Sequence, residues 1–246
     1  TDFLGGAPAN VACALKKLNI DSIFIGCLGS DDFGKKFIAQ FNELDVNLDF
    51  LQVDKDSSTR VVNVDRDQFG DRSFSGFEAS SNLNFADEVL SKQLLEKELL
   101  NLEKLFLETK YLVTGTNILS SPTSAETIFF LLEQANKFQV KIIIDLNWRE
   151  VFWDYSSFSS KINMTARVNL IKKFLNHAHV LKLAKEEATL FFGHENPLLI
   201  SQQMSKSPDV IITDGKNPIV WCINGLLGTT ETPKSKKIID TTGAGD

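Results

Sequence analysis

The feature that most constrains the fold is a repeated alternation of short apolar runs with segments that carry apolar residues at helical spacing. The apolar runs lie at 22–28, 111–114, 141–145, 180–183 and 210–213. Because these runs are continuously apolar, they are typical of strands covered on both faces. The helical segments lie at 9–18, 33–44, 125–138, 169–176 and 185–192. This order predicts an α/β fold, a three-layer αβα sandwich around a mostly parallel sheet.

Residues 47–77 interrupt this alternation. They contain three short β-rich runs, at 50–53, 60–65 and 72–77, with a turn at 67–71 and no helical pattern. The pattern predicts a small antiparallel β lid inserted in a single domain over residues 1–246. A lid that closes over a site excludes water from the reaction, although an ordinary β excursion has the same pattern.

Charge and composition exclude several classes of protein. A net charge of −6 argues against nucleic-acid and anionic-membrane surfaces, because both need basic patches. No apolar run approaches the roughly 18 residues of a membrane span, so we expect a cytoplasmic protein. The three cysteines have no CxxC spacing and the three histidines form no ligand set. We therefore expect buried cysteines and neither a disulfide framework nor a zinc site.

The last seven residues, 240–246, have the sequence DTTGAGD. Because Gly243, Ala244 and Gly245 carry almost no side chain, their N–H groups can approach a ligand closely. At a helix start such groups form an anion site, and Asp246 beside them could take a proton from an attacking hydroxyl. The alternative is a glycine-rich turn with a capping aspartate.

A second small-residue turn, GGAPAN at residues 5–10, precedes the first helical segment. Asn10 can donate and accept hydrogen bonds, which recognition of a polyol requires. The alternative is an ordinary helix N-terminus with Pro8 near the first helical position.

Together the two motifs resemble the signatures of the PfkB, or ribokinase, family of carbohydrate kinases. The resemblance continues through residues 25–34, IGCLGSDDFG, which are similar to the family's G-x-D-x-F-G run, and spans essentially all 246 residues. It implies a ribokinase-like fold and the transfer of phosphate from Mg-ATP to the primary hydroxyl of a small sugar. It also implies that Gly5, Gly6 and Asn10 contact the sugar, that Gly243, Ala244 and Gly245 form the anion hole, and that Asp246 is the base.

Three further segments resemble landmarks of the family. Residues 145–149, DLNWR, resemble the D-x-N-x-R segment of fructokinase-like members, which implies substrate contacts from Asn147 and Arg149. Residues 211–215, IITDG, resemble a strand that ends near the nucleotide phosphates at Thr213 and Gly215. Residues 182–188, KLAKEEA, resemble the N-x-x-E segment of the ATP site. They imply ATP binding by Lys182 and a metal-bound water ordered by Glu187, although Ala184 replaces the asparagine.

Other charged positions have more than one interpretation. Asp240 and Thr242 resemble positions that bind a monovalent cation, such as K⁺, in some members of the family. Arg60, Arg66 and Arg72 lie in the predicted lid. They could hold phosphate or sugar oxygens, or they could be solvated charges that discourage strand pairing.

Fructose, converted to fructose 6-phosphate, is the substrate that the fructokinase-like segments favour. Ribose, 2-keto-3-deoxygluconate and adenosine are the alternatives. A rival interpretation is a binding or regulatory protein derived from a kinase, because fold does not fix function. The partners implied are the sugar, ATP and Mg²⁺, and a homodimer is left open. We expect the chain to be incomplete at both ends, and the 246 residues alone not to turn over.

Overall fold

The computed structural model describes residues 4–66, 72–77, 85–154 and 164–233. The chain divides into two compact units, one within residues 1–95 and one over residues 96–236, and each is described by itself. The single domain expected over residues 1–246 stays a prediction.

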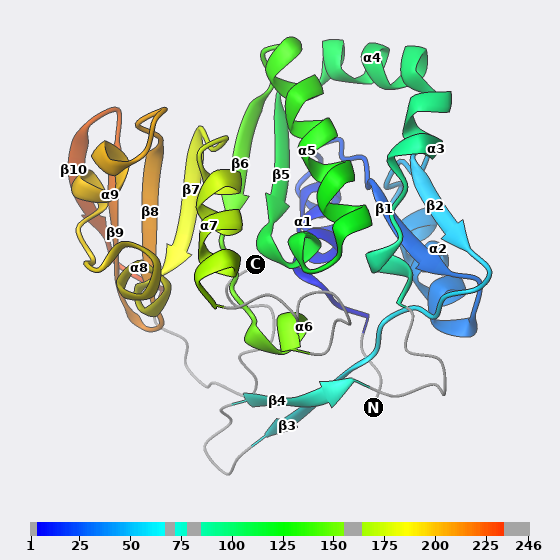
Figure 1. Ribbon diagram of the computed structural model, residues 1–246, viewed down its shortest axis with the longest axis horizontal. Coiled ribbons are helices and arrows are strands. Elements are labelled where there is room, and N and C mark those ends of the chain that lie inside the picture. The colour runs from blue at the N-terminus through cyan, green and yellow to red at the C-terminus, as the bar shows by residue number, and fades with distance from the viewer. Residues whose placement is uncertain (1–3, 67–71, 78–84, 155–163, 234–246) are drawn as a thin grey trace. The chain divides into compact units, whose positions relative to one another are not determined.

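The second unit is built on a six-stranded sheet of order β10-β9-β8-β7-β6-β5 (Figure 1). Its strands are β5 (Tyr111–Gly115), β6 (Lys141–Asp145), β7 (Val180–Ala184), β8 (Asp209–Asp214), β9 (Asn217–Ile223) and β10 (Leu226–Thr230). Strands β5 to β8 are parallel, and β9 and β10 are antiparallel to their neighbours. The parallel part agrees with the sequence pattern, whereas the β9–β10 hairpin is an addition to it.

Helices connect and cover these strands. They are α4 (Leu99–Glu108), η2 (Thr116–Ser120), α5 (Pro122–Lys137), α6 (Glu150–Asp154), α7 (Met164–Leu175), α8 (Lys185–Phe192) and α9 (Pro197–Gln203), with α3 (Lys92–Lys97) at the division between the units. Helix α5 packs against β6, α8 against β7 and β8, and α9 against β8 and β9. The pattern predicted α5, α7 and α8.

The core of the second unit lies on one face of the parallel strands. Its most buried strand residues, each at most 2% exposed, are Ile142, Ile144, Leu181, Leu183, Val210 and Ile212. Fully burying such a side chain stabilises the fold by roughly 1.5–3 kcal/mol. The rows of buried residues therefore fix the register in which the strand ends, and the polar residues after them, line up.

The first unit contains α1 (Ala7–Lys17), β1 (Gly26–Gly29), α2 (Asp32–Glu43), β2 (Leu51–Asp54), β3 (Val62–Arg66), β4 (Arg72–Phe77) and η1 (Ala86–Glu88). Strand β2 pairs with β1 in parallel, whereas β3 and β4 pair with each other in antiparallel. The expectation that residues 50–53 belong to the antiparallel lid is therefore wrong. Within the described residues that ladder consists of β3 and β4, whereas Leu51 of β2 packs against the buried cluster of α1 and α2.

The turn between β1 and α2 explains the spacing of its glycines and aspartate. Asp31 caps α2 by accepting hydrogen bonds from the N–H of Gly34 at 2.8 Å and of Thr59 at 2.6 Å. Burial opposes ionisation of Asp31, but these hydrogen bonds outweigh it and hold its pKa below the ordinary value. A Cβ on Gly34 would lie 2.0 Å from the carbonyl oxygen of Gly29, so only glycine fits there.

All three cysteines, Cys13, Cys27 and Cys222, are free thiols, and each is buried as expected. Burial raises the pKa of Cys13, and it raises the pKa of Cys27 to about 11. Among the described residues, no helix has the length and apolar character needed to cross a bilayer.

Candidate functional site

The carboxyl ends of the parallel strands gather most of the sequence-predicted residues of the second unit. In the sheet register, Asp145 pairs with Gly115 on one side and with Lys182 on the other, and Ala184 pairs with Thr213. This edge is where open α/β sheets bind ligands. The predicted residues at or directly after these strand ends are Asn147, Arg149, Lys182, Glu187, Thr213 and Gly215.

An ion pair joins the ends of β6 and β7. Lys182 Nζ lies 2.9 Å from Asp145 Oδ2, and the side chains are 24% and 19% exposed. A half-buried pair of this kind keeps a charged amine at the strand ends without leaving it isolated. Lys182 was predicted from the sequence as an ATP-binding residue, and Asp145 was not predicted. The signal that could have identified Asp145 is a carboxylate at the end of a buried apolar strand.

Glu187 links two backbone segments. Its Oε1 accepts a hydrogen bond from the Trp148 N–H at 2.5 Å, and its Oε2 accepts one from the Ala184 N–H at 2.7 Å. Burial raises the pKa of Glu187, against these two hydrogen bonds, and the charge of Asp145 adds to the rise while that of Lys182 opposes it. The carboxylate is therefore held in place by backbone donors on both of its oxygens.

The chain leaves β6 through an unusual backbone conformation at Asn147. Asn147 has a φ of 41°, in the left-handed region that asparagine tolerates better than most residues. The following Trp148 ring packs against Trp153 and Phe191, with centroid distances of 5.5 and 5.6 Å. These aromatic contacts fix the start of the segment that carries Arg149.

Thr213 and Gly215 lie at the turn between β8 and β9. Gly215 has a φ of 53°, which the tight connection between antiparallel strands requires. Beside it, Lys185 Nζ lies 3.2 Å from Asp214 Oδ2. Hydrogen bonds from Asn217 and Lys185 lower the pKa of Asp214. The turn thus places a lysine at the start of α8 next to the predicted phosphate-binding residues.

One polar residue at this edge of the sheet was not predicted from the sequence. Asn117 follows β5, and its Oδ1 is buried with no hydrogen-bond partner among the described residues. A buried acceptor without a partner is costly, so this atom can take a donor from a ligand or a water. The signal was a polar side chain two positions beyond the end of an apolar strand.

The predicted sugar residues of the first unit surround the start of α1. Gly6 is the N-cap of α1, with a φ of 109° that favours glycine, and its carbonyl accepts a hydrogen bond from the Asn10 N–H at 2.9 Å. Gly5 and Gly6 are exposed, and Asn10 is half-buried. The geometry explains Gly6 and the position of Asn10 on the first turn of α1.

Arg60 is not a solvated edge charge. Its side chain is 7% exposed and pairs with Asp87 at 2.9 Å and Glu88 at 2.8 Å. Its guanidinium lies 4.6 Å from the ring centroid of Phe77 and 4.0 Å from that of Phe85. The solvated interpretation is wrong for this residue because its partners lie near residue 87, far along the chain. The side chains of Arg66 and Arg72 lie outside the described part of the structure.

The DTTGAGD segment also lies outside the described residues. The roles expected for Asp240, Thr242, Gly243, Ala244, Gly245 and Asp246 therefore stay predictions. Within the described ranges, no group of three or more His, Cys, Asp or Glu side chains could hold a metal ion.

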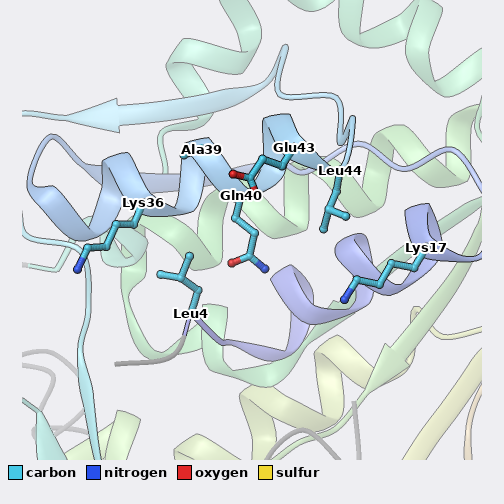
Figure 2. A pocket seen from close by; sticks show the side chains of 7 residues that line it. All are labelled: Leu4, Lys17, Lys36, Ala39, Gln40, Glu43 and Leu44. Atoms are coloured by element: carbon cyan, nitrogen blue, oxygen red, sulfur yellow. The ribbon is translucent and has the colours of Figure 1, made fainter. Parts of the chain in front are cut away.

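A hollow of about 530 Å³ between α1 and α2 contains none of the candidate site residues. Figure 2 shows Gln40 between Lys36 and Lys17, with Leu4 just below Gln40 in this view. The residues that line it are Leu4, Lys17, Lys36, Ala39, Gln40, Glu43 and Leu44. This hollow therefore does not mark the candidate functional site.

Comparison with known proteins gives a consistent match over the whole chain. Residues 1–246 match the model of a family described as pfkB family carbohydrate kinase. A fructokinase from Salmonella typhimurium is 27% identical over 247 residues, covering 98% of this chain and 73% of that protein. An ATP-dependent 6-phosphofructokinase from Thermoanaerobacterium thermosaccharolyticum is 25% identical over 256 residues, covering 99% and 69%. The crystal structure of a fructokinase with bound ATP from Xylella fastidiosa superposes with a TM-score of 0.81 at 26% identity, covering 98% and 70%.

Proposed function

Because this chain belongs to the PfkB family of carbohydrate kinases and is a sugar kinase with a ribokinase-like fold, we propose that its substrate is fructose and its product fructose 6-phosphate. The observation that carries this proposal is the position of Asn147 and Arg149. They follow β6, whose last residue, Asp145, pairs with Lys182, in a segment that resembles that of fructokinases. The relatives named fructokinase support the same sugar.

In the proposed mechanism, the chain mainly positions two reactants and stabilises charge. Gly5, Gly6 and Asn10 hold the sugar hydroxyls, and Asp246 takes the proton of the primary hydroxyl as its oxygen bonds to the γ-phosphorus. The bond from that phosphorus to the β–γ bridging oxygen breaks, and ADP leaves. The N–H groups of residues 243–245 stabilise the charge that develops on the transferred group.

The nucleotide side of the proposed site consists of Lys182, Thr213 and Gly215. Lys182 pairs with Asp145 at the ends of β6 and β7, and Gly215 gives a backbone turn that a phosphate can approach. Mg²⁺, when bound with ATP, neutralises phosphate charge, and Glu187 is the candidate to order one of its waters. Asp240 and Thr242 are candidates for a K⁺ site.

A panel of sugars tests the substrate. ADP release by the complete protein is measured with fructose, ribose, 2-keto-3-deoxygluconate and adenosine, and with fructose 6-phosphate because a 6-phosphofructokinase is among the relatives. We expect the highest kcat/KM with fructose. Equal or higher kcat/KM with another acceptor would replace fructose, and sugar binding without ADP release would favour a non-catalytic binding protein.

Asp246→Asn is the control variant for that assay. Sugar affinity should be nearly unchanged, while kcat falls by roughly 10² to 10⁴, the usual contribution of a general base. A variant that turns over within a few-fold of the parent would remove Asp246 from the mechanism.

A cytoplasmic location and a homodimer complete the proposal. Light scattering coupled to gel filtration tests the dimer, and fractionation of cells tests the location. Replacing K⁺ with Na⁺ in the ADP assay tests the monovalent cation, with slower turnover expected in Na⁺.

A further inference from the structure

The contacts of Glu187 join two chain segments that come from different strands. Its two oxygens accept hydrogen bonds from the N–H of Trp148, after β6, and from the N–H of Ala184, at the end of β7. Hydrogen bonds to an ionised carboxylate are shorter and stronger than those between neutral groups. One half-buried side chain therefore ties the segment that carries Asn147 and Arg149 to the start of α8.

The residue at the start of α8 explains why Glu187 makes this contact. Ala184 is the N-cap of the helix, and alanine has no side-chain acceptor for the first N–H groups. Glu187 is at the third helical position, from which a glutamate can reach back to the N-cap N–H. The second oxygen of the same carboxylate remains for Trp148.

The hydrogen bond to Trp148 also acts on the residue before it. Asn147 has a φ of 41°, and a residue other than glycine keeps such a conformation only when its surroundings hold it there. The Trp148 N–H is held by Glu187, and the Trp148 ring is held by Trp153 and Phe191. The backbone on the carboxyl side of Asn147 is thus fixed at two points.

We propose that Glu187 is a positioning residue for the sugar, which holds the backbone of Asn147 and Trp148 through its second oxygen. This inference rests on the proposed function, because Asn147 and Arg149 are assigned there to the sugar. It is an alternative to the family-implied role of ordering a metal-bound water, and that role predicts instead a defect in Mg²⁺ use. In the positioning role, loss of Glu187 weakens binding of the sugar and leaves the Mg²⁺ requirement unchanged.

The first test needs no turnover. In protein labelled with ¹⁵N-tryptophan, hydrogen exchange of the Trp148 amide is measured in Glu187→Ala and in the control Glu186→Ala, whose side chain is exposed on the same turn. We expect exchange at Trp148 to accelerate at least ~10-fold in Glu187→Ala and to change less than ~2-fold in the control, since a broken hydrogen bond lowers local protection. Unchanged protection of Trp148 in Glu187→Ala would overturn the inference.

The second test separates the two roles by kinetics. In Glu187→Ala the KM for fructose should rise ~5- to 10-fold, with the half-saturating Mg²⁺ concentration within ~2-fold of the parent. A rise in the Mg²⁺ requirement at unchanged sugar KM would overturn the positioning role. If no sugar is phosphorylated by the parent, the proposed function fails, while the exchange test still decides whether Glu187 holds Trp148.

A further variant separates positioning from simple helix capping. Adding Ala184→Ser to Glu187→Ala supplies a new N-cap side chain and should restore the unfolding midpoint. It cannot restore the bond to Trp148, so the sugar KM and the fast exchange should persist. If Ala184→Ser restored both the sugar KM and the slow exchange of the Trp148 amide, Glu187 would act only as a helix cap, and the inference would be overturned.

Discussion

Two clusters of charged side chains, one in each unit, differ in how completely they are enclosed. Arg60 lies between two aromatic rings and two carboxylates and is 7% exposed. Lys182 and Asp145 also pair closely, but both side chains keep about a fifth or more of their surface exposed at the end of the sheet. The Arg60 side chain is almost fully covered, whereas the Lys182–Asp145 pair keeps exposed surface that a ligand could contact.

The comparison shows that burial of charge alone does not mark a functional residue. An enclosed pair such as Arg60 with Glu88 compensates its own desolvation within the fold, and breaking it costs stability. A pair at strand ends is less costly to separate, so its amine is available to a phosphate. We therefore expect substitutions in the two clusters to affect different measurements.

Arg60→Met should give the largest loss of stability. Removing one partner of a buried pair leaves the others unpaired, and we expect about 3 kcal/mol of destabilisation, at the low end of the usual range because Asp87 is half exposed. Urea denaturation followed by circular dichroism measures it. The control Lys35→Met breaks an exposed pair with Asp32 and should cost less than ~1 kcal/mol. Equal midpoints for the two variants would contradict the comparison.

Lys182→Met should affect turnover more than stability. We expect kcat/KM for ATP to fall ~10-fold, since a charge-assisted contact to phosphate is lost. The matched control is Lys137→Met, which breaks the pair with Glu103 in the same unit. Both variants should unfold at similar urea concentrations. If Lys182→Met lost stability but kept its kcat/KM, the Lys182–Asp145 pair would have a structural role like that of the Arg60 cluster.

The loss of stability in Arg60→Met should also depend on pH, which distinguishes this cluster further from the Lys182–Asp145 pair. Burial raises the pKa of Glu88 above 4.5, the charge of Asp87 adds to the rise, and Arg60 opposes it. An acid with a raised pKa in the folded state stabilises less as pH rises through that window. Without Arg60 the pKa of Glu88 rises further, so the loss of stability in Arg60→Met should be larger at pH 7 than at pH 5. Denaturation curves at the two pH values measure it, and an equal deficit would mean that Arg60 does not act on Glu88.

Lys185→Met should give the smallest effect. Lys185 pairs with Asp214 at 3.2 Å at the protein surface, so the unfolding midpoint should not change measurably. If the Thr213–Gly215 turn receives phosphate, the KM for ATP should rise ~3-fold, because one nearby positive charge is lost. Initial rates over a range of ATP concentrations decide this. An unchanged KM would remove Lys185 from the surroundings of the nucleotide.

Local patterns predicted most of the parallel part of the fold. Residues 141–145 and 185–192 were expected as a strand and a helix, and they are β6 and α8 with the same bounds. Continuous apolar runs and helical spacing are local properties, so sequence reports them directly. The β9–β10 hairpin was missed even though Asn224 and Gly225, at φ of 50° and 76°, form the Asn-Gly turn that usually signals one.

Partners far apart in the sequence could not be predicted in the same way. The pairing of β2 with β1 depends on packing around Phe41 and Leu28, not on the composition of residues 50–53. Arg60 meets its carboxylates 27 and 28 residues later, and Glu187 reaches an N–H 39 residues earlier. Sequence identified Glu187 by family resemblance, but only the folded backbone shows which atoms its oxygens contact.

The burial of the three thiols protects them from oxidation in the folded protein. A thiol with a pKa of about 11, as at Cys27, is almost entirely protonated at neutral pH, and the thiolate is the reactive form. Cys13 and Cys27 lie in the first unit and Cys222 in the second. Alkylation of each cysteine by a thiol reagent therefore waits for its own unit to open, and the order in which the three are modified records which unit opens first.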